Sequence, residues 1–261
     1  MPLWGVIGGS GLSGIPGLEI TESVAVATPY GNPSGDYSLG RISGKEVAFL
    51  PRHGAGHNIQ PHRINYRANL WGFRELGVRR ILSAGASGGI SRNMRPGAIT
   101  LPDQIIDITA GRESTFHDKD EVVHIDFTDP FCPDLRARLA DAAHRTGIDV
   151  IPTGTYICVN GPRLETAAEI RTYASWGADM IGMTAMPETI LARELEMCFA
   201  SLSVITNHAA GISGQRLAVS EVIGTMRSSM DRIRTLLGAF FTQDMAAPEC
   251  ACGQALKDAK V

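Results

Sequence analysis

Residues 202–211 read LSVITNHAAG, an apolar run that ends at Asn207 and passes into small residues. A short, uninterrupted apolar run of this kind is typical of a strand buried inside an α/β sheet. The side-chain amide of Asn207 carries a donor and an acceptor on one planar group, so it can bind a partner that offers the complementary pair. The simpler alternative is that Asn207 caps a turn, which is a common role for asparagine.

The same design recurs on the N-terminal side of this strand. Apolar runs that pass into glycine or polar residues occur at 3–9 (LWGVIGG), 79–89 (RRILSAGASGG) and 153–162 (TGTYICVNGP). Helices are expected at 134–147, around 166–175, around 187–196 and at 219–240, where apolar residues repeat about every 3.6 positions and indicate a core-facing helix. Strands that alternate with helices indicate an α/β fold with a mostly parallel or mixed sheet covered on both faces.

Length and composition describe one soluble globular domain. The chain has 261 residues, 44% of them hydrophobic, and a net charge of −3, which fits a single large α/β domain. We expect this domain at 1–243 and a C-terminal tail at 244–261. No apolar run approaches the roughly 20 residues that span a bilayer, no basic leader begins the chain, and no basic run offers a surface to nucleic acid. The protein is therefore expected in the cytoplasm, with neither a membrane nor nucleic acid as partner.

Five cysteines lie at positions 132, 158, 198, 250 and 252. Their spacing does not resemble a zinc site, because Cys250-x-Cys252 has no second pair nearby in the sequence. A reducing cytosol would keep the thiols free, although proteins of thermophiles are an exception. No metal is expected, and the redox state of the cysteines stays open.

Polar residues follow the apolar strands, which is where open α/β sheets bind ligands. GGSG at 8–11 places the hydroxyl of Ser10 in a glycine turn that fits an anion. PRHGAGH at 51–57 offers the planar fork of Arg52 and a second donor on His53. The small residues of SAGASGG at 83–89 let backbone amides approach a ligand. Each segment also has a structural alternative as a tight turn or a solvated loop.

A fourth segment, MIGMTAMPE at 180–188, joins an apolar strand to a helix opened by Pro187. The hydroxyl of Thr184 beside this helix N-terminus again suits an anion. Met183 has the alternative role of a core residue.

The chain resembles the trimeric nucleoside phosphorylases of the methylthioadenosine phosphorylase type, within the purine nucleoside phosphorylase family. The resemblance rests on motifs that occur in order from residue 5 to residue 194: GVIGGSGL, RHGAGH, INYRANLWG, GGI, DQIID, DPFCP, GPRLET, ADMIGMTAMPE and ARE. It implies a single-domain α/β fold around a mixed, partly barrel-like β-sheet flanked by helices. It also implies phosphorolysis of a purine nucleoside, with inorganic phosphate as co-substrate and no metal or cofactor.

The resemblance also assigns residues. The phosphate contacts of that family fall on Ser10, which replaces the usual threonine, and on Arg52, His53, Gly85, Ala86 and Thr184. Its nucleoside contacts fall on His124, Leu164, Glu165, Met183, Asn207, His208, Ala209, Val219 and Val222. Asn207 and His53 are the residues expected to take part in catalysis, and Asn207 lies where the family binds purine N7.

Two positions bear on which purine is cleaved. Where this chain has Thr206-Asn207-His208-Ala209, relatives that cleave 6-aminopurines have a sequence similar to T-D-x-D. Where it has Leu164 and Glu165, those relatives carry an aromatic residue and a serine. A Glu165 carboxylate accepts from N1–H, which hypoxanthine and guanine have and adenine lacks. The Asn207 amide can accept from N7–H and donate to O6. Both changes indicate 6-oxopurine nucleosides. The alternative for Glu165 is a surface residue at a helix start.

The sequence leaves three candidates for the substituent at the 5′ end of the sugar and the purine it is joined to. By the resemblance, Val219 and Val222 line an apolar 5′ pocket, and His124 reaches the sugar of a neighbouring subunit, which implies a homotrimer or a dimer of trimers. An apolar pocket discriminates weakly against a hydroxyl, so inosine, guanosine and 5′-methylthioinosine all remain candidates.

Three alternatives are weighed against this hypothesis. A nicotinamide-dependent oxidoreductase should show G-x-G-x-x-G, and the glycine spacing differs here. A non-catalytic purine-binding protein would lack the phosphate-binding set. The remaining alternative is a 5′-methylthioadenosine phosphorylase that acts on the 6-aminopurine.

Overall fold

The computed structural model describes residues 3–8, 15–119, 121–214, 216–244 and 249–261, so the predicted phosphate contact at Ser10 lies outside the described residues. Along the chain the strands are β1 (Leu3–Gly8), β2 (Leu18–Val24), β3 (Tyr37–Ile42), β4 (Lys45–Pro51), β5 (Val78–Gly89), β6 (Ile99–Thr100), β7 (Gln104–Asp107), β8 (Val150–Ile151), β9 (Thr155–Cys158), β10 (Met180–Gly182) and β11 (Cys198–His208). The α-helices are α1 (Tyr66–Glu75), α2 (Pro133–Thr146), α3 (Ala167–Ser175), α4 (Ala185–Glu194) and α5 (Val219–Thr242), and short 3-10 helices occur at η2 (Pro61–Arg63) and η3 (Cys252–Gln254).

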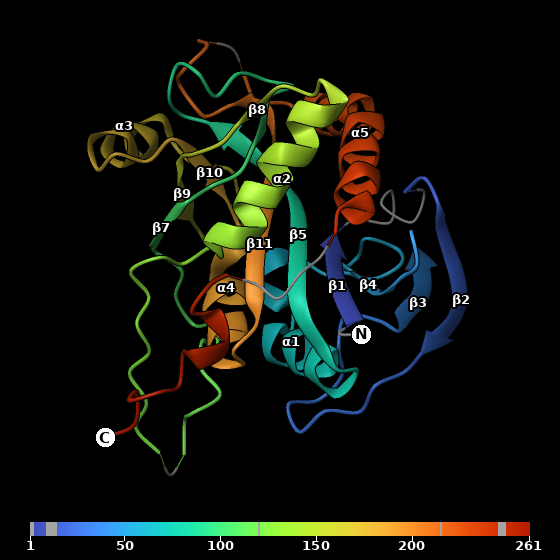
Figure 1. Cartoon of the computed structure of the whole chain (residues 1–261). Helices are drawn as coiled ribbons and strands as arrows, with labels where there is room; N and C mark the ends of the chain where they lie inside the picture. Colours follow the sequence, from blue (N-terminus) through green and yellow to red (C-terminus); the bar gives the residue numbers. More distant parts are fainter. Residues whose placement is uncertain (1–2, 9–14, 120, 215, 245–248) are drawn as a thin grey trace.

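The strands form one mixed 11-stranded sheet with β5 at its centre (Figure 1). Its main path runs β2-β3-β4-β1-β5-β10-β9-β7, and β11 joins β5 to β6 and β8. β11 lies parallel to β5 from the Cys198–Arg80 pair to the His208–Gly89 pair. The sheet forks because β5 pairs with β1 along its first half and with β10 at its last residues. The predicted mixed α/β fold is confirmed.

Helices cover both faces of the central strands. On one face α2 and α5 lie side by side over Trp4, Leu82 and Leu202 (Figure 1). On the other face α1 and α4 pack against Ile81 and Phe199. Both faces of β11 are therefore buried, which explains its unbroken apolar run.

Most elements expected from the sequence are present, and their ends follow the expected chemistry. α2 begins after Cys132, whose sulfur accepts from Leu135 N, and it ends at Gly147, whose φ of 67° is left-handed. α3 begins with a capping box between Thr166 and Glu169. Helix α1 and the antiparallel β2–β3–β4 unit were not predicted.

The expectation that α5 faces the core along its whole length is wrong for its first turns. Leu236 and Phe240 are fully buried, whereas Val219 is 66% exposed and Ile223 is 54% exposed. The apolar period of α5 therefore continues beyond the core of this chain onto its surface.

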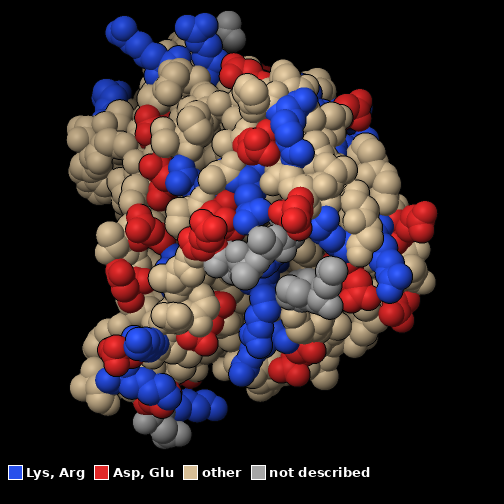
Figure 2. Space-filling model, viewed as in Figure 1, with Lys and Arg blue, Asp and Glu red and all other residues tan. Residues whose placement is uncertain are grey.

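The C-terminal residues 249–261 pack against the body of the protein. Cys252 is 1% exposed, Leu256 N donates to Glu196 Oε1 at 3.3 Å, and Lys260 forms an isolated bridge with Val123. Within the described residues no helix is long and apolar enough to cross a membrane. Basic and acidic side chains are interspersed over the face shown in Figure 2.

Candidate active site

The C-terminal half of the central strand is open to solvent although strands flank it. Gly85 pairs with Ser203 and Ala86 pairs with Val204 of β11. Ala86 is nevertheless exposed, and Gly85 is half-buried. The sheet is therefore uncovered over these two residues, and a ligand can lie against the backbone of β5.

The guanidinium of Arg52 is buried beneath this opening and paired with Glu188. Arg52 Nε donates to Glu188 Oε1 at 2.6 Å and Nη2 donates to Oε2 at 3.1 Å, and the two side chains are 3% and 0% exposed. Nη2 also donates to Ser83 Oγ at 2.6 Å, and Nη1 donates to the Ala84 carbonyl at 3.0 Å. An arginine has five N–H donors, so these bonds leave one N–H on Nη1.

The remaining N–H lies beside Gly85 and Thr184. A Cβ added to Gly85 would stand 3.8 Å from Arg52 Nη1 and 4.0 Å from Thr184 Oγ1. Thr184 is the N-cap residue of α4, but its hydroxyl makes no capping hydrogen bond and is available to a ligand. A guanidinium and a hydroxyl thus converge on one glycine, which is a suitable site for an anion.

The structure changes the role predicted for His53. Its Nδ1 lies 2.9 Å from the Ile59 carbonyl, which can only accept, so Nδ1 is the donor. Burial lowers the pKa of His53 from 6.5 to about 4, so the ring is neutral near pH 7. Its second nitrogen, Nε2, is consequently an acceptor and not the donor expected from the sequence. The proton in any bond to phosphate must then come from the phosphate itself.

Three segments that carry predicted nucleoside contacts meet at the far end of β5. A Cβ on Gly161 would collide with Met183, and a Cβ on Gly211 would stand 2.6 Å from Ala167 Cβ. Met183 also packs in one apolar cluster with Ala209. The loop before α3 therefore lies between the start of α4 and the segment that follows β11.

The Asn207 amide is buried and only partly engaged. It follows a bulge in β11, and a Cβ added to Gly88 would stand 3.4 Å from its Nδ2. Nδ2 donates to the His208 carbonyl at 2.9 Å, and Oδ1 accepts from Thr206 Oγ1 at 2.9 Å. One amide hydrogen and one carbonyl lone pair remain for a ligand. Among the described residues, His208 Nδ1 is buried without a hydrogen-bond partner.

Glu165 is half-buried in the loop immediately before Thr166, the N-cap of α3. Burial raises the pKa of its carboxyl group. In the described ranges the Glu165 carboxylate belongs to none of the ion pairs. Its neighbour Leu164 is 38% exposed.

The residues predicted to contact the 5′ end of the sugar lie at the surface of this chain. Val219 is exposed and Val222 half-buried at the start of α5, and His124 is exposed on the loop between β7 and α2. The backbone N–H of His124 donates to Ala259 in the C-terminal segment.

Sequence reasoning missed two residues that hold the site together, the buried Glu188 and the half-buried Arg112. Glu188 neutralises Arg52, and its only sign in the sequence is a carboxylate just after Pro187 at a helix start. Arg112 donates to the carbonyls of Met183 at 2.8 Å, Met186 at 2.5 Å and Asn160 at 3.0 Å. It thereby ties the loop before α3 to the start of α4, and no sequence pattern indicated it.

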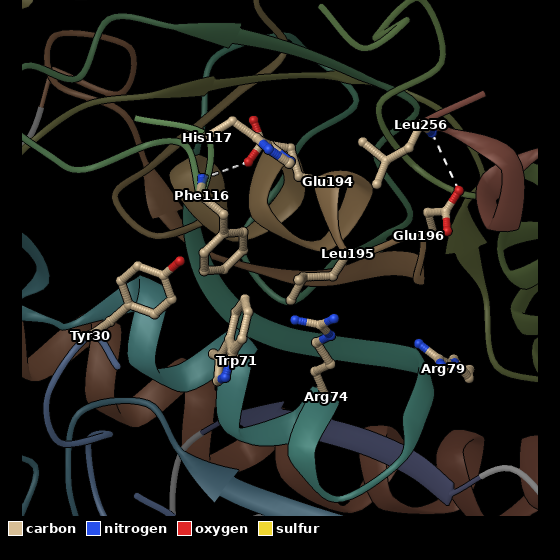
Figure 3. A pocket seen from close by; sticks show the side chains of 10 residues that line it. All are labelled: Tyr30, Trp71, Arg74, Arg79, Phe116, His117, Glu194, Leu195, Glu196 and Leu256. Atoms are coloured by element: carbon tan, nitrogen blue, oxygen red, sulfur yellow. Dashed lines mark hydrogen bonds between the residues drawn. The ribbon is translucent and has the colours of Figure 1, made fainter. Parts of the chain in front are cut away.

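A separate hollow of about 320 Å³ lies on another part of the molecule (Figure 3). It is lined by Tyr30, Trp71, Arg74, Arg79, Phe116, His117, Glu194, Leu195, Glu196 and Leu256. None of these residues belongs to the predicted site.

Comparison with known proteins identifies the family. A probable S-methyl-5′-thioinosine phosphorylase of Thermodesulfovibrio yellowstonii is 50% identical over 98% of this chain and 96% of its own length. The 6-oxopurine nucleoside phosphorylase of Pyrococcus furiosus is 46% identical over 99% of both chains. The solved structure of methylthioadenosine phosphorylase from Schistosoma mansoni in complex with adenine superimposes with a TM-score of 0.93 at 29% identity, covering 100% of this chain and 99% of that one. The phosphorylase superfamily matches residues 4–242, and this chain therefore belongs to that superfamily of enzymes.

Proposed function

We propose that the protein cleaves the N-glycosidic bond of 6-oxopurine nucleosides with inorganic phosphate. The substrates are inosine, guanosine or 5′-methylthioinosine, and the products are the free purine base and ribose 1-phosphate or its 5-methylthio analogue. The observation that carries this proposal is the buried amide of Asn207, which keeps one free donor and one free acceptor close to the anion site on β5.

The anion site supports the first half of the reaction. As the C1′–N9 bond breaks, positive charge develops on the ribose, and a phosphate held against Gly85 offsets that charge and attacks C1′. Arg52 and Thr184 would each supply one hydrogen bond to this phosphate. Because Nε2 of the neutral His53 ring can only accept, it would bind the protonated oxygen of monohydrogen phosphate and leave the other oxygens to attack.

Asn207 supports the second half of the reaction, in which the purine departs. The departing purine gains negative charge, which is relieved when N7 takes up a proton. The free lone pair of Asn207 Oδ1 would accept from N7–H, while the free hydrogen of Nδ2 would donate to O6. A 6-aminopurine offers a donor at that position, so two donors would meet.

Glu165 also favours a 6-oxopurine over a 6-aminopurine. A half-buried carboxylate outside every ion pair of the described residues is suited to accept from N1–H of hypoxanthine or guanine. Adenine has a lone pair at N1, which would face this carboxylate. Each buried polar group left unpaired costs about 1–3 kcal/mol. The relatives named for 6-oxopurine or thioinosine substrates are 45–50% identical to this chain.

We also propose that the protein is a cytoplasmic homotrimer or dimer of trimers that needs no cofactor. Val219 is 66% exposed and Ile223 is 54% exposed at one end of α5, and exposed apolar groups of this kind favour a subunit interface. A neighbouring subunit would cover them and bring its His124 toward the sugar. Light scattering that shows an active monomer would refute the assembly.

The test of the reaction is its dependence on phosphate. The purified protein should release hypoxanthine from inosine or 5′-methylthioinosine only when phosphate is present, with one sugar 1-phosphate formed per base. Base release that is independent of phosphate would make the protein a hydrolase. Nucleoside binding without any release would make it a purine-binding protein.

The second candidate function is 5′-methylthioadenosine phosphorylase. It is kept because relatives with this name are 40–42% identical over 98% of the chain. The same assay with 5′-methylthioadenosine distinguishes it, because that enzyme would prefer the 6-aminopurine.

A further inference from the structure

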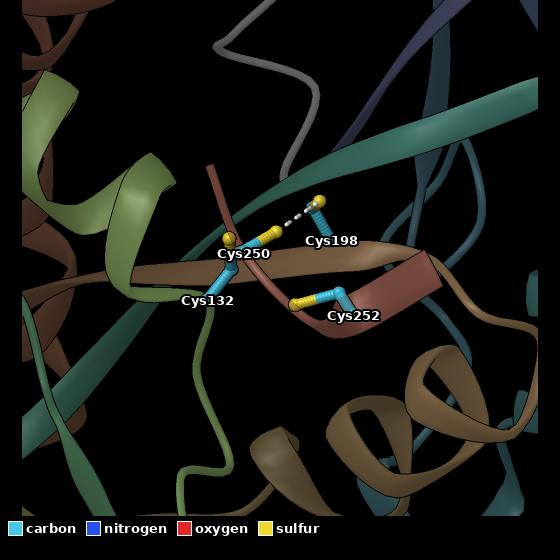
Figure 4. Close-up of side chains that lie close together, drawn as sticks. All are labelled: Cys132, Cys198, Cys250 and Cys252. Carbon is cyan, nitrogen blue, oxygen red and sulfur yellow. Dashed lines mark hydrogen bonds between the residues drawn. The ribbon is translucent and has the colours of Figure 1, made fainter. Parts of the chain in front are cut away.

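Four of the five cysteines meet in one cluster although they lie far apart in the sequence. This four-cysteine cluster contains Cys132 before α2, Cys198 at the start of β11, and Cys250 and Cys252 in the C-terminal segment (Figure 4). Their Sγ atoms all lie within 4.8 Å of one another. Three of these residues are buried, and Cys250 is half-buried. The spacing along the chain hides the cluster, because the Cys250-x-Cys252 pair meets its second pair only through the fold.

The separations fit four thiolates around one metal ion. Around tetrahedral zinc, with Zn–S bonds of about 2.3 Å, neighbouring sulfur atoms stand about 3.8 Å apart. The sulfur atoms of Cys198 and Cys250 are 3.4 Å apart, and the whole cluster stays within 4.8 Å. A disulfide would bring a pair of sulfur atoms to about 2.05 Å. The thiols thus surround a common centre and are not arranged as bonded pairs.

One contact of the cluster suits negatively charged sulfur, which is the form that binds metals. Cys132 is the N-cap of the 14-residue helix α2, and its Sγ accepts from Leu135 N at 3.5 Å. The positive end of a helix stabilises an anion. The cluster contains only cysteine, and an all-sulfur ligand set selects soft or borderline ions such as Zn²⁺ over Mg²⁺ or Ca²⁺.

We propose that the four-cysteine cluster binds one Zn²⁺ as a closed structural site. With four protein ligands, no position remains for water or substrate, so the ion would stabilise the fold and take no part in the reaction. It would tie the C-terminal segment to the start of β11 and to the loop before α2. Through the bonds from His124 N to Ala259 O at 2.8 Å and from Val261 N to Val122 O at 3.1 Å, it would also order the loop that carries His124.

The test is metal binding by the full-length protein kept reduced. Elemental analysis after purification without added metal should find about one Zn²⁺ per chain. Titration of the metal-free protein with Co²⁺ should reach its end point at about one equivalent and give the strong visible absorption of tetrahedral cobalt–thiolate coordination. Cys250→Ser and Cys132→Ser should each reduce the Zn²⁺ content and abolish that spectrum.

Cys158→Ser is the matched control. Cys158 is also a buried free cysteine, but its sulfur contacts the backbone of Met186 and lies outside the cluster. This variant should keep the full Zn²⁺ content and the Co²⁺ spectrum. The wild-type Co²⁺ spectrum decides the question even where a cysteine variant fails to fold.

Two results would overturn the proposal. One is a fully reduced protein with five titratable thiols that binds neither Zn²⁺ nor Co²⁺. The other is an intact mass lower by four hydrogens in the protein as isolated, which would show that the four thiols exist as two disulfides. Neither result depends on the proposed phosphorolysis, and a failure of phosphorolysis would leave metal binding unaffected.

Discussion

Replacing Arg52 by methionine should affect stability and phosphate binding through different contacts of one side chain. In the structure, most of its donors serve the fold, because Nε and Nη2 bond to Glu188 and Ser83 and Nη1 bonds to the Ala84 carbonyl. One Nη1 hydrogen faces the position beside Gly85. The two roles can therefore be separated by a double substitution.

The stability effect follows from burial. Arg52→Met leaves the Glu188 carboxylate, which is 0% exposed, with Ser83 as its remaining partner in this network. Removing one partner of a buried pair destabilises a protein by about 3–5 kcal/mol. Replacing both partners with apolar side chains is often neutral, so Arg52→Met/Glu188→Leu should recover most of that loss.

Phosphate affinity should not recover. The single N–H of Arg52 that faces the site represents one charge-assisted hydrogen bond, worth about 1.5–3 kcal/mol. Because every 1.4 kcal/mol is a factor of ten, the KM for phosphate should rise about 10- to 150-fold in both the single and the double variant.

Chemical unfolding at fixed protein concentration measures the first effect, and initial rates against phosphate concentration measure the second. Arg41→Met is the matched control, because Arg41 pairs with Glu46 at 66% and 49% exposure and should cost less than about 1 kcal/mol. A phosphate KM within about twofold of wild type in both Arg52 variants would show that Arg52 does not bind phosphate.

Three further predictions concern the same site. Thr184→Val should raise the phosphate KM about 10-fold or more with unchanged unfolding midpoint, because its hydroxyl caps no backbone group; an unchanged KM contradicts this. His53→Gln should flatten the rise of stability with pH between about 4 and 6.5, where the folded protein keeps His53 neutral and the unfolded chain protonates it; an unaltered slope in unfolding series across that range contradicts it. Asn207→Asp should shift the ratio of 6-oxopurine to 6-aminopurine cleavage by more than about 10-fold toward the amino substrates, and an unchanged ratio would return Asn207 to the role of a turn cap.

The parts of the site that could be predicted from the sequence are those that depend on local order. Arg52 and Thr184 each follow an apolar strand, Gly85 lies in the glycine-rich second half of β5, and strands that meet at one end of a sheet bring such residues together. The apolar run of β11 likewise showed that both its faces are covered.

The parts that could not be predicted depend on partners distant in the chain. Glu188 meets Arg52 across 136 positions, and Cys132 meets Cys252 only because the C-terminal segment folds back. The acceptor role of His53 is set by the Ile59 carbonyl and by burial, neither of which is visible in RHGAGH. The exposed first turns of α5 follow the same apolar period as its core turns, and the sequence does not distinguish them.

The choice of a 6-oxopurine over a 6-aminopurine can be measured as a ratio of two specificity constants. At saturating phosphate, kcat/KM for 5′-methylthioinosine should exceed kcat/KM for 5′-methylthioadenosine by more than about 10-fold, because Asn207 and Glu165 each oppose the 6-aminopurine by about 1–3 kcal/mol. The kcat/KM for inosine should likewise exceed the kcat/KM for adenosine. Equal values would show that Asn207 and Glu165 do not select the purine, and a preference for 5′-methylthioadenosine would identify the protein as a methylthioadenosine phosphorylase.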